Sequence, residues 1–135
     1  MTHSPAAADA AAARPRTYQL QIRLSRPVRI QVGRLGEFEF PAGRYVYTGS
    51  ARRAMDARIR RHLSHTKRMH WHIDYLLAAP GAAITGVILS DEPECRLNHD
   101  TPGVIVAAGF GASDCSSGCG SHLVLVARAR RAQRG

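Results

Sequence analysis

The stretch GRYVYTGSARRAMDARIRRHLSHTKRMHWHIDYLL, Gly43 to Leu77, decides the fold because its residue pattern changes period part-way through. Its first residues alternate as in a strand, which places Tyr45 and Tyr47 on one face and Val46 on the other. Beyond the glycine-serine pair that follows, the apolar residues recur every four positions, which is the spacing of an amphipathic helix. The stretch therefore predicts a strand that leads directly into a helix.

The helix and the segment after it can be placed from their apolar and terminating residues. The apolar stripe consists of Ala51, Met55, Ile59 and Leu63. Ser50 is suited to cap the helix N-terminus, and we expect the helix to run to about His65. A second short helix is expected over residues 71–79, where a proline-glycine pair ends it.

Alternating apolar residues predict further strands on both sides of this stretch. They lie at 17–24, 28–32, 37–40, 83–89 and 121–127, and a short helix is expected at 92–99. The apolar segment 103–108 is either a strand or an insertion. The first three strands should form an antiparallel meander with the strand at 45–48. Together these elements predict an α+β fold, a small and mainly antiparallel sheet with two or three helices packed on it.

The chain has 135 residues, so we expect one domain with one hydrophobic core. The N-terminal segment lacks the basic start and leucine-rich middle of a signal peptide, and we expect residues 1–14 to be a disordered, alanine-rich tail. The folded domain should cover 15–127, and a basic tail should follow over 128–135. Because no apolar run approaches the ~20 residues of a membrane span, we expect a cytoplasmic location.

The positive charge is concentrated in two segments. Residues 52–68 hold seven basic residues and one acid, and residues 128–134 add four arginines, so these segments carry all of the net charge of +9. A concentrated basic stripe is typical of a nucleic-acid partner. The candidate contact residues are Arg52, Arg53, Arg61, Lys67 and Arg68. The alternative is a solvated helix face, since 18 of the 19 basic residues are arginine and could reflect a composition bias.

Arginine, histidine and tyrosine side chains are expected to meet where the helix joins the sheet. Arg58 and His62 lie four residues apart and share one helix face beside the apolar stripe. Arginine binds phosphate oxygens through two parallel hydrogen bonds, and the hydroxyl of a tyrosine such as Tyr47 can orient a water or pass a proton. The arrangement suits phosphate chemistry. The alternative is that the tyrosines are core residues and Arg58 is an ordinary surface charge.

The motif HWHID contains two histidines and an acid in five residues. His70 and His72 could be ligands or proton carriers, and Asp74 could accept a hydrogen bond from either of them. Equally, the histidines could cap the second helix and pack Trp71 into the core.

Three cysteines and a histidine form a candidate zinc set. An odd number of cysteines argues against a disulfide framework. Cys95, Cys115, Cys119 and His122 offer three sulfurs and one imidazole, the ligand set of a closed tetrahedral zinc site. We therefore expect near-stoichiometric zinc in the purified protein. The alternative is three reduced thiols with His122 at the start of a strand.

Several sequence blocks also resemble a known family. They are TYQLQIRL (17–24), GRLGEFEFPAGRYVYTGSA (33–51), RIRRHL (58–63), HWHIDYLL (70–77), EC (94–95), GFGASDC (109–115) and SHL (121–123). On these blocks the chain resembles the bacterial and archaeal family known as domain of unknown function 123, a branch of the GIY-YIG nuclease superfamily. In that superfamily two tyrosine motifs lie on neighbouring strands, an arginine and often a histidine follow on a helix, and a later glutamate binds one divalent metal.

The resemblance implies a set of catalytic positions. They are Tyr18, Tyr47, Arg58 and His62, with Glu94 as the magnesium ligand. The first motif here reads RTY and the second YTG, so both depart from the family's GIY and YIG. The glutamate is not fixed by its spacing, because Asp74, Asp91 and Glu92 are rivals.

The implied activity is metal-dependent hydrolysis of a phosphodiester in DNA, in the context of DNA repair. A tyrosine would position the attacking water, Arg58 would stabilise the charge of the transition state, and Glu94 would hold Mg²⁺. Two alternatives remain open. One is a non-catalytic nucleic-acid-binding module, and the other is a zinc-stabilised adaptor of a repair enzyme.

Overall fold

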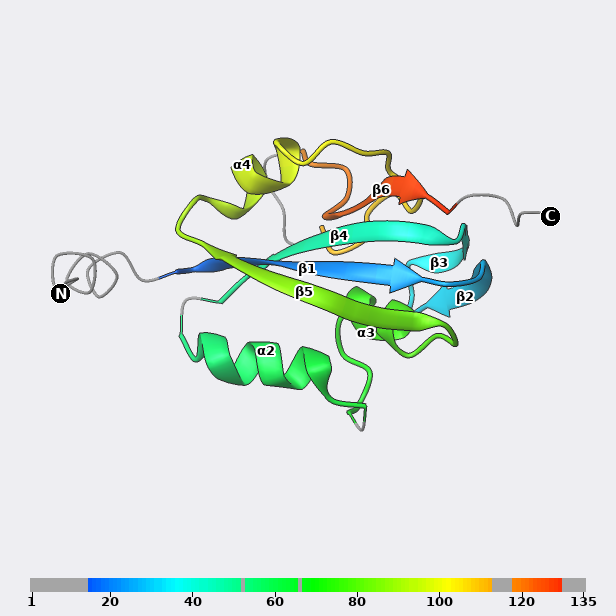
Figure 1. Cartoon of the computed structure of the whole chain (residues 1–135), viewed down its shortest axis with the longest axis horizontal. Coiled ribbons are helices and arrows are strands. Elements are labelled where there is room, and N and C mark those ends of the chain that lie inside the picture. Colours follow the sequence, from blue (N-terminus) through cyan, green and yellow to red (C-terminus); the bar gives the residue numbers. More distant parts are fainter. Residues whose placement is uncertain (1–14, 52, 66, 113–117, 130–135) are drawn as a thin grey trace, which may run out of the picture.

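A four-stranded antiparallel sheet and a separate two-stranded hairpin form the β part of the molecule. The computed structural model describes residues 15–51, 53–65, 67–112 and 118–129. The sheet has the strand order β5-β1-β4-β6, with β1 and β4 in the centre (Figure 1). Its strands are β1 (Thr17–Leu24), β4 (Gly43–Ser50), β5 (Ala82–Ser90) and β6 (Leu123–Arg128), and the hairpin consists of β2 (Val28–Val32) and β3 (Gly36–Phe40).

Strand β1 supplies the centre of the hydrophobic core. Its apolar residues alternate toward one face, and Tyr18, Leu20, Ile22 and Leu24 are all buried. Across the ladder, Tyr45 and Tyr47 of β4 lie opposite Ile22 and Leu20 and are buried on the same face. The predicted alternation of both strands is confirmed.

Three short helices complete the fold of the described residues. They are α2 (Met55–Leu63), α3 (His72–Leu77) and α4 (Glu94–His99). In the view of Figure 1, α2 lies below the strands and α4 above them. The structure thus confirms the predicted α+β class with its mainly antiparallel sheet.

The predicted meander of the first four strands is wrong. Strand β1 pairs with β4 and β5, whereas β2 and β3 pair only with each other among the described strands. In the sequence the β2–β3 hairpin lies between β1 and β4, and these two strands pair directly with each other in the sheet. Alternation within each strand contains no information on which strands pair. The segment 103–108 contributes an isolated bridge, Val104 to Leu125, instead of a strand.

The start and the buried face of α2 also differ from the expectation. Ser50 ends β4 and does not cap the helix, which begins at Met55 after Ala54 in the left-handed region at φ 53°. His62 is 2 % exposed, whereas Leu63 of the predicted stripe is 48 % exposed. The helix turns the histidine inward because its ring contacts the buried aromatic residues of β1 and β4.

The carboxylate of Asp74 joins the end of α2 to the start of α3. It accepts two hydrogen bonds from the Arg61 guanidinium, at 3.0 and 2.9 Å, and one each from the backbone N–H groups of His70 and Trp71, at 2.8 and 2.9 Å. Burial raises the pKa of Asp74, but these hydrogen bonds outweigh that effect and lower the pKa below its ordinary value. A fully buried carboxylate thus stays ionised and fixes the two helices relative to each other.

We predict that Asp74→Ala lowers the free energy of unfolding by about 3 kcal/mol, because it leaves a largely buried guanidinium and two backbone donors without their acceptor. Urea unfolding of the full chain measures this change. Asp56→Ala is the matched control, since Asp56 is an exposed acid in the first turn of α2. A loss no larger than that of the control would contradict the role given to Asp74.

Candidate functional site

Four side chains from β1, β4 and α2 meet beside the N-terminal end of β1, and we call them the tyrosine cluster: Tyr18, Tyr47, Arg58 and His62. The Tyr18 hydroxyl lies 2.7 Å from His62 Nε2. The ring centroids of Tyr18 and Tyr47 are 6.4 Å apart, and each lies within 6.2 Å of the His62 ring. Residues separated by up to 44 positions in the sequence therefore form one contact group.

Tyr18 can lie in this position because the residue opposite it on β4 is glycine. Tyr18 pairs with Gly49 in the ladder, and a Cβ atom at Gly49 would lie 2.5 Å from the phenol oxygen. No side chain fits in that space without moving the ring. The glycine of the YTG motif therefore sets the position of the phenol.

Burial keeps the three titratable members of the cluster neutral. It raises the pKa of Tyr18 to about 12 although the nearby Arg58 guanidinium opposes the shift, and it also raises the pKa of Tyr47. It lowers the pKa of His62 to about 4. At neutral pH the 2.7 Å contact therefore joins a neutral phenol and a neutral imidazole, and the tautomer of His62 decides which of them donates. The other ring nitrogen of His62 has no hydrogen-bond partner among the described residues.

Arg58 forms the partly exposed edge of the cluster. Its guanidinium lies 4.5 Å from the centre of the Trp71 ring and donates to the Ser50 carbonyl at 3.1 Å. Arg61 lies over the same tryptophan ring at 4.3 Å. The aromatic ring thus supports two guanidinium groups, and Arg58 keeps a fixed position next to Tyr18.

Two acids, Glu94 and Asp74, affect the pKa values of both tyrosines, and Glu94 is the partly exposed one. Its negative charge contributes to the raised pKa values of Tyr18 and Tyr47, as does that of the buried Asp74. Its Oε2 accepts a hydrogen bond from His122 Nδ1 at 2.7 Å, and the Ser50 side chain also bonds to the carboxylate. Burial raises the pKa of Glu94, but these bonds outweigh it and lower the pKa below its ordinary value. The Glu94 carboxylate is therefore ionised at neutral pH.

The rival acids lie in other environments. Asp74 is fully buried and occupied by four hydrogen bonds, whereas the exposed residues Asp91 and Glu92 lie between β5 and α4. A single ionised carboxylate with several lone-pair positions suits Mg²⁺, which keeps most of its waters. Glu94 fits this role best among these four acids.

The predicted nucleic-acid contacts divide into two groups. Arg53 and Arg68 are exposed. Arg61 is bound to Asp74, and the Lys67 amine donates to the carbonyls of Arg61, His62 and Ser64 at the C-terminal end of α2. Arg52 lies outside the described residues. Two of the predicted contact residues thus make intramolecular contacts.

The HWHID residues make structural contacts. Asp74 links two helices as described above, and His72 Nδ1 accepts a hydrogen bond from the Gly111 N–H at 2.8 Å. Burial lowers the pKa of His72, which favours this acceptor form. His70 is exposed, and its ring lies 5.3 Å from that of Trp71.

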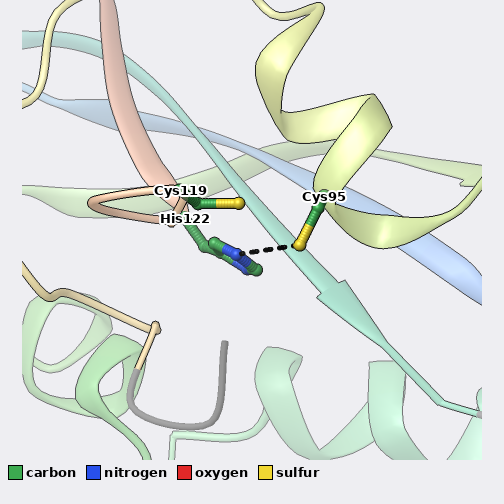
Figure 2. A group of neighbouring side chains, drawn as sticks. All are labelled: Cys95, Cys119 and His122. Atoms are coloured by element: carbon green, nitrogen blue, oxygen red, sulfur yellow. Dashed lines mark hydrogen bonds between the residues drawn. The ribbon is translucent and has the colours of Figure 1, made fainter. Parts of the chain in front are cut away.

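A second group, which we call the thiol cluster, consists of Cys95, Cys119 and His122 (Figure 2). Cys95 lies on α4, and the other two residues lie in the segment that leads into β6. One potential ligand atom of each residue lies within 4.8 Å of the others, and the group could hold a metal ion. Three of the four residues of the predicted zinc set therefore come together, and Cys115 lies outside the described residues.

A family model, the domain of unknown function DUF123, matches residues 17–134. The chain belongs to this family. The match confirms the resemblance to that family stated above. No curated protein and no solved structure matches the chain. None of the helices in the described part of the DUF123 chain is long and apolar enough to cross a membrane.

Sequence reasoning missed the contacts that tie these groups together. Ser50, Trp71 and the Glu94–His122 pair support the predicted residues, but were not predicted to contact them. The Glu94–His122 pair joins residues 28 positions apart. Residue spacing predicts which side chains are neighbours on one helix or strand. It cannot predict a pair between a residue of α4 and a residue that precedes β6.

We predict that stability decreases as the pH falls from about 6.5 toward 4. The pKa of His62 is lower in the folded chain than its ordinary 6.5, so the unfolded chain binds more protons in this window. Protonation of His62 should lower the free energy of unfolding by at most about 3 kcal/mol. His72 should add to this decrease, because its pKa is also lowered in the folded chain.

Urea unfolding of the full chain across this window measures the effect. His62→Asn should flatten the pH dependence, whereas His99→Asn, at an exposed histidine of α4, should leave it unchanged. A wild-type free energy of unfolding that stays constant over the window would contradict a neutral, buried His62.

Proposed function

We propose that this DUF123 domain is a metal-dependent phosphodiesterase of the GIY-YIG nuclease type that acts on DNA. The observation that carries the proposal is the meeting of two phenols, an imidazole, a guanidinium and an ionised carboxylate near one end of β1. These groups match the catalytic positions that the resemblance implies. The exposed arginines that flank α2, Arg53 and Arg68, supply positive charge for a DNA backbone.

Arg58 and Glu94 are the members of this site that a phosphate can reach directly, since both are partly exposed. The guanidinium of Arg58 would bind the non-bridging oxygens and stabilise the negative charge that develops on them. Glu94 is the residue that would hold a divalent ion, which supplies Lewis-acid stabilisation to the phosphate and the leaving oxygen.

The Tyr18–His62 pair offers a route for the proton of the attacking water. As the water oxygen bonds to phosphorus, its proton would pass to the Tyr18 oxygen while the Tyr18 proton passes to His62 Nε2. The P–O bond to the leaving oxygen breaks, and that oxygen takes a proton from solvent. The 2.7 Å contact between Tyr18 and His62 suits this relay in the tautomer that leaves Nε2 unprotonated.

One observation favours a second function, a nucleic-acid-binding module that does not cleave. Tyr18 is 1 % exposed and Tyr47 is 8 % exposed, so a substrate reaches the phenols only if the Arg58 edge moves. In a binding module both phenols would remain core residues, and the arginines alone would contact the backbone.

A cleavage assay with Mg²⁺ on single-stranded, duplex and branched DNA separates these functions. We predict that the wild-type chain cleaves at least one of the three, and that Arg58→Ala lowers the rate about 100-fold or more because transition-state stabilisation is lost. Arg60→Ala removes the same charge from an exposed position on the same helix and should retain most of the activity.

The outcomes have distinct meanings. Cleavage that survives Arg58→Ala would refute the assigned site. Salt-sensitive binding without cleavage would establish the binding module, because counterion release makes backbone binding weaken with salt. Binding to none of the three DNA substrates and not to RNA either would exclude both functions and leave the adaptor of a repair enzyme.

A further inference from the structure

The thiol cluster lies apart from the helix α2 and combines residues from two regions of the chain. Cys119 and His122 are buried, and Cys95 is partly buried. The Cys95 sulfur lies 4.0 Å from His122 Nε2. Such a concentration of sulfur and imidazole in an interior position has the composition of a metal-ligand set.

The type of donor atom selects the type of ion. Thiolate and imidazole are soft or intermediate donors, which bind Zn²⁺ strongly and do not suit Mg²⁺ or Ca²⁺. Zinc–sulfur bonds of about 2.3 Å in a tetrahedral site place two sulfurs about 3.8 Å apart. The donor atoms here lie within 4.8 Å of one another, so contraction by about 1 Å or less brings them to bonding positions.

An independent contact also indicates a metal ligand. His122 Nδ1 lies 2.7 Å from Glu94 Oε2, so the carboxylate holds the proton on Nδ1 and leaves Nε2 as the lone-pair nitrogen that faces Cys95. Histidines that bind metals characteristically donate their other N–H to a carboxylate or carbonyl, which fixes the tautomer and the ring orientation. The imidazole is thus already oriented for coordination.

We propose that Cys95, Cys119 and His122 bind a zinc-type ion, and that Glu94 is the carboxylate that orients His122. The three side chains fill three of the four tetrahedral positions. The same carboxylate also bonds to the Ser50 side chain, and the Ser50 carbonyl accepts a hydrogen bond from Arg58, so an ion at the thiol cluster would hold Glu94 next to the tyrosine cluster. The metal site stands on its own geometry, whereas this link between the clusters rests on the proposed function.

Metal content and affinity test the site. Full-length protein with reduced thiols, stripped of metal and then dialysed against zinc, should retain about one equivalent by elemental analysis. Replacement by Co²⁺ should give intense sulfur-to-cobalt charge-transfer absorption. Cys119→Ser should lose the stoichiometric zinc. Should this variant fail to fold, the cobalt spectrum of the wild-type chain decides, and an absence of both zinc and that absorption overturns the site.

Matched variants test the role of Glu94. Glu94→Gln should still bind zinc but with an affinity lowered about 10- to 100-fold in competition with a chromophoric chelator, since the neutral amide orients the imidazole less well. Glu92→Gln, at an exposed position two residues away, should bind as the wild type does. Equal affinities of the two variants would overturn the orienting role of Glu94.

The rate of DNA cleavage with Mg²⁺, measured before and after removal of zinc, tests the link between the thiol cluster and the tyrosine cluster. A fall in rate on removal, reversed by zinc, supports the link, and an unchanged rate overturns it. A wild-type chain that binds zinc with the expected stoichiometry but never cleaves overturns the proposed function and the link, and leaves the metal site in place.

Discussion

The buried carboxylate of Asp74 is the constraint on which the arrangement of the helices depends. It binds Arg61 on α2 and the two backbone N–H groups that begin α3, so neither helix can shift without breaking charged hydrogen bonds. Arg58 and His62 lie on the same helix as Arg61, and their positions over Trp71 and beside Tyr18 follow from this attachment. A residue outside the candidate catalytic set thereby determines where that set lies.

The periodicity of the sequence predicted the strands and their buried faces well, because alternation is a local property of β1 and β4. It failed where distant segments decide the outcome. Pairing of β1 with β4 instead of β2 depends on the whole sheet, and the inward position of His62 depends on aromatic rings from other strands. Leu63 was predicted to be buried because it continues the four-residue apolar stripe, but it lies at the C-terminal end of α2 and is exposed.

The same distinction applies to the site. The residue types for phosphate and metal chemistry could be predicted from the sequence and the family resemblance, and the structure brings most of them into two groups. Their contacts could not be predicted. Glu94 was expected to be a magnesium ligand, yet it also accepts a hydrogen bond from His122. Because the charge of this one carboxylate also raises the pKa of Tyr18 and Tyr47, the two groups are electrostatically linked.

The position of Lys67 has a practical consequence for chemical labelling. It is the sole lysine among 19 basic residues, and its amine is held by three carbonyls at the C-terminal end of α2, where burial also lowers its pKa. Acylation of this amine would remove its charge and release the three carbonyls. Surface immobilisation or dye attachment through amines should therefore be directed to the chain terminus, so that the end of α2 next to His62 keeps its shape.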